Sequence, residues 1–202
     1  MDLTAEYDYV AILDALPENE RGILRISELL ASQLASGGID QFRGYSKSKA
    51  HLFAYLERIF LPRARAGEHF MLHVISHGGE EGLWVKSTNE DIWWRELTPV
   101  LEEINSAMSG HLLANFSSCI GGKAIHIVNA AAERTPFFGM IGPRRTIDAG
   151  EAIAANAAFY RSLMSDSDVP KAVEAANSAL GDEVMYAVSA EGFQGAKRGK
   201  TE

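Results

Sequence analysis

The chain has 202 residues, a formal net charge of −8, and 47% hydrophobic against 23% charged residues. This length predicts a single domain whose core is large enough to be stable without disulfides or metal ions. The negative charge argues against a nucleic-acid-binding protein, which needs a basic surface to displace counterions from phosphates, and no apolar run approaches the roughly 18 residues that span a bilayer.

Apolar runs of strand length alternate with helix-like stretches along the chain. Residues 83–85 and 92–94 predict a hairpin, and Asp168 and Gly181 mark the start and the end of a late helix. The alternation predicts an α/β fold with a mostly parallel sheet. We expect strands at 7–13, 42–46, 70–75, 112–116, 137–141 and 185–188, and helices at 21–34, 47–60, from Thr98-Pro99 onward, at 123–132, 149–164 and 169–180.

The cysteine content and the first residues bear on location and domain organisation. Cys119 is the only cysteine, so no disulfide can form within the chain, and a reducing interior is its natural environment. Residues 1–6 are acidic and lack the charged-then-apolar pattern of a signal peptide. We therefore expect a cytoplasmic protein with one domain over residues 1–192 and a flexible basic tail at 193–202.

Two of the predicted strands run directly into polar turns. The strand at 70–75 leads into a turn that contains His77, and the strand at 112–116 leads into a turn that contains Cys119. Ligands of open α/β sheets bind at the carboxyl ends of the strands. If the two strands are parallel neighbours, His77 and Cys119 should therefore share one crevice.

A thiol beside an imidazole is the usual arrangement for nucleophilic catalysis by cysteine. The thiolate is the nucleophile, and an imidazole can remove the thiol proton and later protonate a leaving amine. Gly121 and Gly122 would let the chain turn sharply after Cys119, and backbone N–H groups at such a turn can bind an oxyanion. A lone cysteine is more often a small buried hydrophobic residue, so the prediction depends on the pairing with His77.

These segments also carry a family resemblance. The sequence Ile-Ser-His-Gly at 75–78, followed by Glu-Glu-Gly at 80–82, resembles the histidine motif of caspases, and Ser-Cys-Ile-Gly at 118–121 resembles the cysteine motif of the wider caspase-like clan. His77 and Cys119 are 42 residues apart, close to the caspase interval of about 50. Residues 149–180 resemble the helical region of CHAT peptidases, the largely bacterial branch of this clan.

The resemblance implies a caspase-haemoglobinase fold, with about six mostly parallel strands flanked by helices and a small hairpin after the histidine loop. It implies an intracellular cysteine endopeptidase in which His77 is the general acid and base and Cys119 is the nucleophile. The backbone amides of Gly78 and Cys119 would form the oxyanion hole. Caspases have Gln-Ala before the cysteine where this chain has two serines, so Ser117 marks a substrate-binding position without indicating a preference.

The expected partners are a protein or peptide substrate and a further protein that activates or regulates the enzyme, with no nucleic acid and no membrane. Likeness to CHAT peptidases suggests a role in bacterial defence or regulated cell death. Two other functions stay open. The chain could be a catalytically silent caspase-like module that binds a partner, or a cysteine-dependent acyl transferase or hydrolase that acts on a small substrate.

No cofactor is expected, and the histidine spacing does not predict a metal site. His69, His73 and His77 recur at every fourth residue. In a strand this spacing places them too far apart to bind one ion. We expect His73 to be a histidine of the core.

Overall fold

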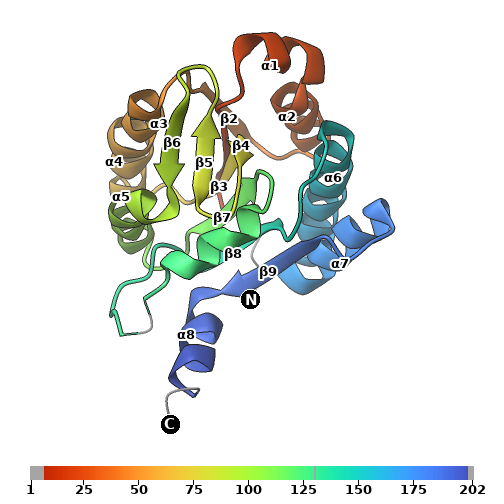
Figure 1. Cartoon of the computed structure of the whole chain (residues 1–202). Helices are drawn as coiled ribbons and strands as arrows, with labels where there is room; N and C mark the ends of the chain where they lie inside the picture. The colour runs from red at the N-terminus through yellow and green to blue at the C-terminus, as the bar shows by residue number, and fades with distance from the viewer. Residues whose placement is uncertain (1–6, 130, 200–202) are drawn as a thin grey trace.

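The computed structural model describes residues 7–129 and 131–199, which form one six-stranded and one three-stranded sheet with surrounding helices (Figure 1). In chain order the elements are β1 (Tyr9–Asp14), α1 (Glu18–Leu24), α2 (Ile26–Ser36), β2 (Gln41–Tyr45), α3 (Lys49–Tyr55), the π-helical η2 (Leu56–Phe60), α4 (Leu61–Arg65), β3 (Phe70–Ile75), β4 (His77–Gly78), β5 (Gly82–Val85), β6 (Glu90–Trp93), α5 (Trp94–Ala107), β7 (Leu113–Ser117), the 3-10 helix η3 (Gly121–Ile127), β8 (Gly139–Pro143), α6 (Ala149–Asp166), α7 (Val169–Leu180), β9 (Met185–Ser189) and α8 (Ala190–Arg198).

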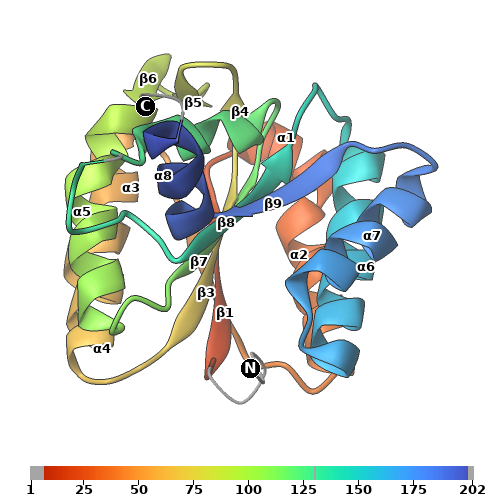
Figure 2. The same ribbon diagram turned by 90° about the horizontal axis from the view of Figure 1, so that it is seen from below.

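The large sheet has the strand order β2-β1-β3-β7-β8-β9. Its neighbouring strands are parallel apart from β8 and β9, which are antiparallel. Helices α3, α4, α5 and α8 cover one face, and α2, α6 and α7 cover the other (Figure 2). The prediction of an α/β fold with six mostly parallel strands between helices is confirmed.

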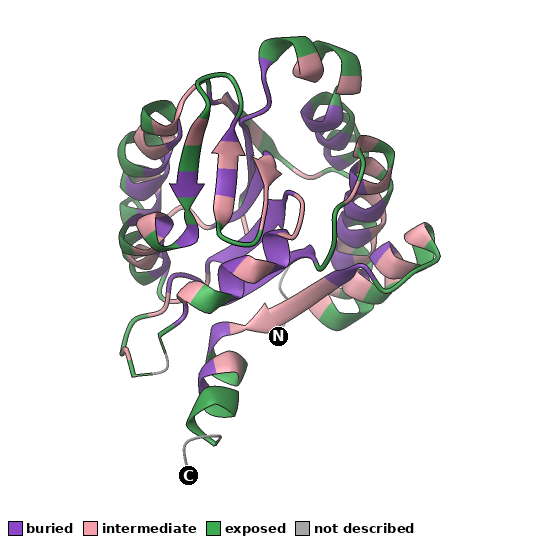
Figure 3. Cartoon of the chain, in the orientation of Figure 1, coloured by how far each residue is buried: buried purple, intermediate pink, exposed green. Residues whose placement is uncertain are grey.

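The central strands are buried on both faces because helices cover both sides. Every residue of β1, β3 and β7 is buried (Figure 3). Successive side chains point to opposite faces of a sheet, so Leu72 and Val74 join one apolar cluster, while Met71 and Ile75 join the other. This double burial explains why the predicted strands are continuous apolar runs rather than alternating ones.

The small sheet follows directly on β3 and has the order β4-β5-β6. β5 and β6 form the predicted hairpin. β4 adds a third, antiparallel strand in which His77 pairs with Trp84. The histidine turn is therefore part of an ordered sheet and not a free loop.

The helix predicted at 21–34 is two helices in the structure. Arg25 adopts a left-handed conformation with φ 51°, and α1 ends there while α2 begins after it. Ile23, which the periodicity places on the buried face, is 79% exposed. The apolar spacing continues across the break, so it does not reveal that α1 is a separate element.

Two further helices differ from the prediction. α5 begins at Trp94, four residues before Thr98, and therefore contains Pro99 inside the helix. The Glu96 carboxylate accepts the backbone N–H of Trp93 at 2.9 Å, and this contact caps the earlier start. The helix expected at 123–132 is the shorter η3.

The chain end also differs from the flexible tail predicted at 193–202. Residues 193–198 belong to α8, which begins after Ser189 as N-cap. The buried side chain of Gln194 donates a hydrogen bond to the backbone oxygen of Asn129 at 2.8 Å. This contact packs α8 against the domain, and residues 200–202 lie outside the described part.

Candidate active site

His77 and Cys119 lie beyond the carboxyl ends of two neighbouring parallel strands. β3 pairs with β7, and the last pair in register joins Ile75 to Ser117. His77 and Cys119 each follow that pair by two residues, and both line one cavity of about 100 Å³. The structure thus brings the two predicted residues to a common crevice at the sheet edge. Its apolar walls come mainly from Leu16, Leu24, Ile26, Ile147 and Ala152.

Cys119 is a partly exposed residue. It lies 3.7 Å from the backbone oxygen of Ile147, to which it can donate a weak hydrogen bond. A sulfur–oxygen contact of this length restrains the side chain only slightly. The sulfur is therefore available to a reactant that enters the cavity.

The sequence predicts that Gly121 and Gly122 make the turn after Cys119, but another residue makes it. Ile120 is the residue with a positive φ, 57°. A Cβ on Gly121 would lie 2.1 Å from the Phe116 carbonyl oxygen, and one on Gly122 would lie 2.0 Å from the ring of Tyr186. The two glycines are therefore needed for close packing of η3, and the turn itself is made at Ile120.

Ser117, the predicted substrate-binding position, is only 5% exposed. It lines the cavity, but its hydroxyl accepts a hydrogen bond from Asn156 Nδ2 of α6 at 3.0 Å. The Asn156 side-chain oxygen in turn accepts from Asn115 Nδ2 at 2.8 Å. Ser117 therefore connects the cysteine turn to α6 through a buried amide network.

We expect Asn156→Ala to lower the free energy of unfolding by about 2–3 kcal/mol, because Asn115 and Ser117 lose a buried hydrogen-bond partner. Urea titration of both proteins measures the change. Ser165→Ala, at an exposed position of the same helix, should stay within about 0.5 kcal/mol of the wild type. An Asn156→Ala protein as stable as that control would show that the network does not support the turn.

Gly78 presents its backbone N–H to the open side of β4. The N–H of Gly79 bonds to the carbonyl oxygen of Gly82 at 2.9 Å. Hydrogen-bonded and non-hydrogen-bonded pairs alternate in antiparallel sheets, so the N–H of Gly78, paired with Leu83, points away from β5. A Cβ on Gly78 would lie 2.9 Å from Ser118 Oγ. Gly78 is thus close to the cysteine turn, on the short strand that carries His77.

A carboxylate that sequence analysis missed stands next to His77. Glu20 Oε2 of α1 lies 2.6 Å from His77 Nε2. The ring of Trp84 packs on the imidazole with its centroid 5.6 Å away. Glu20 belongs to the exposed-looking segment Glu-Asn-Glu-Arg at 18–21, and no local pattern signals its contact with a strand 57 residues later.

The part of the chain that the structure describes offers no group of three metal-ligating side chains. His73 is fully buried, and its Nδ1 lies 2.9 Å from the hydroxyl oxygen of Tyr160. Burial lowers the pKa of His73 to about 3. His73 therefore belongs to the core and is neutral at physiological pH.

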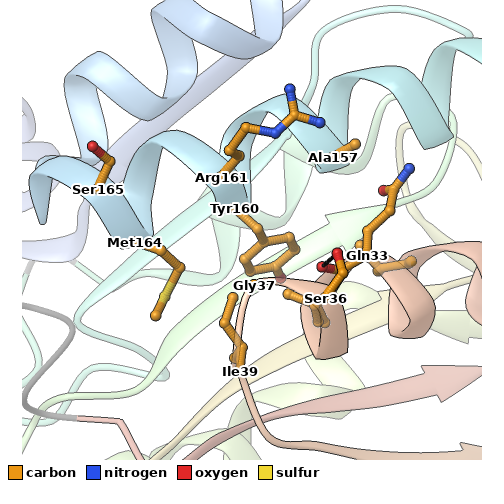
Figure 4. Close-up of a pocket in the computed structure, with 11 residues that line it drawn as sticks. Gln33, Ser36, Gly37, Ile39, Ala157, Tyr160, Arg161, Met164 and Ser165 are labelled. Atoms are coloured by element: carbon orange, nitrogen blue, oxygen red, sulfur yellow. Dashed lines mark hydrogen bonds between the residues drawn. The ribbon is translucent and has the colours of Figure 1, made fainter.

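A larger cavity of about 380 Å³ lies between α2 and α6, with Gln33 on one side and Tyr160 and Arg161 on the other (Figure 4). It shares no lining residue with the cavity at Cys119. Size alone would not select the cavity at Cys119, because this cavity and two others of about 450 and 490 Å³ are larger, but no thiol or imidazole lines any of the three. The chemistry instead favours the smaller cavity.

Within the described ranges, no helix combines the length and the apolar character that crossing a bilayer requires. No protein-family model matches the chain, and no curated protein matches it. The assignment of the site therefore depends on the two motifs and on the geometry that joins them.

Proposed function

We propose that this protein is a cysteine endopeptidase of the caspase-like type, most similar to the bacterial CHAT peptidases. The observation that carries the proposal is the presence of His77 and Cys119 in one cavity, at the carboxyl ends of adjacent parallel strands. The six-stranded sheet and the hairpin after the histidine strand are compatible with a caspase-haemoglobinase fold.

The proposed reaction begins when the Cys119 thiol transfers its proton to His77 and the sulfur attacks the peptide carbonyl carbon. The backbone N–H groups of Gly78 and Cys119 stabilise the resulting oxyanion. The carbon–nitrogen bond breaks as His77 protonates the leaving amine, which leaves a thioester on Cys119. Water, deprotonated by His77, hydrolyses the thioester and regenerates the enzyme.

The proposed substrate is a specific protein partner, cleaved in bacterial defence or regulated cell death. The cavity of about 100 Å³ is smaller than the roughly 300–1,000 Å³ of usual ligand sites. It can take one side chain, so the rest of a peptide would lie across its mouth.

The same small volume favours a second candidate function, that of a catalytically silent module that binds and regulates a partner protein. Such a module would retain the fold and the crevice but would not cleave. An activating protein that enlarges the crevice would reconcile a small cavity with peptidase activity. The following experiment separates a module from an enzyme.

Because Cys119 is the only cysteine, iodoacetamide modifies a single thiol and gives a matched inactive control. We expect the untreated protein to cleave a diverse peptide library, with the cut sites read by mass spectrometry, and the alkylated protein to cleave nothing. Cleavage that persists after complete alkylation would contradict a cysteine mechanism. If neither sample cuts, the protein is a binding module or needs an activator, and slow alkylation of Cys119 at neutral pH would then favour the module.

A further inference from the structure

Glu20 contacts His77 directly, although α1 and β4 are far apart in the sequence. The distance from Glu20 Oε2 to His77 Nε2 is 2.6 Å. The Glu20 side chain is 18% exposed and that of His77 is 32% exposed. Both side chains are therefore partly shielded from water.

The contact assigns the proton positions on the imidazole. A carboxylate accepts hydrogen bonds, so the N–H at Nε2 of His77 is the donor. The neutral ring then has its lone pair at Nδ1, and because Glu20 engages Nε2, Nδ1 is the nitrogen left to accept a proton. A carboxylate on the far nitrogen of a catalytic histidine holds the required tautomer and stabilises the protonated ring.

Lys86 engages the other oxygen of the same carboxylate. Its ammonium group contacts Oε1 of Glu20 and leaves Oε2 to His77. The hydrogen bond from Lys86 is the main cause that lowers the pKa of Glu20, and His77 adds to the effect while burial opposes it. Glu20 is therefore negatively charged when the ring of His77 becomes positive.

Helix α1, which carries Glu20, is held at the sheet edge by polar contacts. The guanidinium group of Arg21 lies 4.6 Å from the centre of the Tyr45 ring, at the end of β2. Asp14, at the end of β1, accepts the hydroxyl of Ser27 at 2.5 Å and thereby fixes the start of α2. None of the residues of α1 is fully buried (Figure 3), and Leu24 is its residue that packs against the apolar core, so polar contacts contribute to the position of this helix.

We propose that Glu20 is the positioning residue of a Glu–His–Cys triad, orienting His77 through Nε2 and stabilising its protonated form. The inference rests on the proposed peptidase function. In the step concerned, the S–H bond of Cys119 breaks and an N–H bond forms at Nδ1 of His77. The positive charge that develops on the ring is balanced by Glu20, which keeps its negative charge and does not touch the substrate.

The test compares Glu20→Gln with Glu18→Gln, a matched change at an exposed position of the same helix. We expect Glu20→Gln to lower kcat for a cleaved peptide by about 10- to 100-fold, with little change in KM. The rate of Cys119 alkylation near pH 6 should also fall, and its pH profile should move to higher pH, because the thiolate–imidazolium pair loses its stabilising charge. Glu18→Gln should match the wild type in both measurements.

A purely structural role for Glu20 would change the melting temperature or the fraction of active protein and would leave the pH profile in place, which would overturn the proposal. Unchanged kcat would also overturn the proposal. An increased kcat would overturn it too, because the contact with Glu20 would then restrain His77 in a position that inhibits the reaction. If the wild type cleaves no peptide, the peptidase function fails on its own. The alkylation profile of Glu20→Gln still decides whether Glu20 acts on the His77–Cys119 pair.

Discussion

Cys119→Ala and His77→Ala are each expected to reduce peptide cleavage by on the order of 10⁴-fold, to the same residual level. Without the thiol there is no nucleophile for the acyl-enzyme. Without the imidazole no base takes the thiol proton, and the leaving amine receives no proton. Steady-state cleavage of a peptide identified from the library measures both losses.

The double variant should be no less active than either single variant, because the two residues act as a unit. Both side chains are partly exposed, so the melting temperatures should stay close to that of the wild type. His51→Ala, which removes an exposed histidine, should retain full activity. A His77→Ala protein with wild-type turnover would remove His77 from the mechanism.

The second large effect concerns acid stability and the buried His73. A histidine in the unfolded chain takes up a proton as the pH falls through about 6.5, whereas burial keeps His73 neutral in the folded protein until about pH 3. Between these values the unfolded state binds more protons, so stability falls as the pH falls. His73 alone should lower the free energy of unfolding by about 3 kcal/mol between pH 7 and pH 4.

His73→Gln removes this titration and keeps a polar group near the Tyr160 hydroxyl, which is the partner of His73 in the wild type. Urea unfolding at pH 7 and pH 4 should show a smaller acid-induced loss for the variant than for the wild type. Burial raises the pKa of Asp14 and gives that residue the opposite pH dependence, so the comparison between proteins isolates His73. Equal losses in the wild type and the variant would show that His73 is protonated in the folded state at pH 4.

Much of the fold could be predicted because its signals are local. The helix α7 is an example, since Asp168 accepts the N–H of Lys171 as N-cap and Gly181 ends the helix in a left-handed conformation. The strands β3 and β7 were predictable for a different reason. A parallel strand between two helical layers is buried on both faces and is therefore apolar along most of its length.

The errors arise where contacts with the rest of the protein override a local pattern. The helix break at Arg25 leaves the apolar spacing intact, so periodicity continues through it. Glu96 starts α5 at Trp94 by bonding the backbone of Trp93, and this outweighs the Thr-Pro signal that follows. Residues 193–198 have a tail-like composition, but they belong to α8, which Phe193 and Gln194 pack against the rest of the protein.

The sequence by itself determined the chemistry of the candidate site: one thiol and one histidine, each placed directly after an apolar strand. Tertiary structure decided which groups surround them. Parallel pairing of β3 with β7 brings His77 and Cys119 together, and the placement of α1 brings Glu20 to the imidazole. Strand ends are encoded in local apolar patterns, whereas a contact across 57 residues depends on how the intervening helices and strands pack.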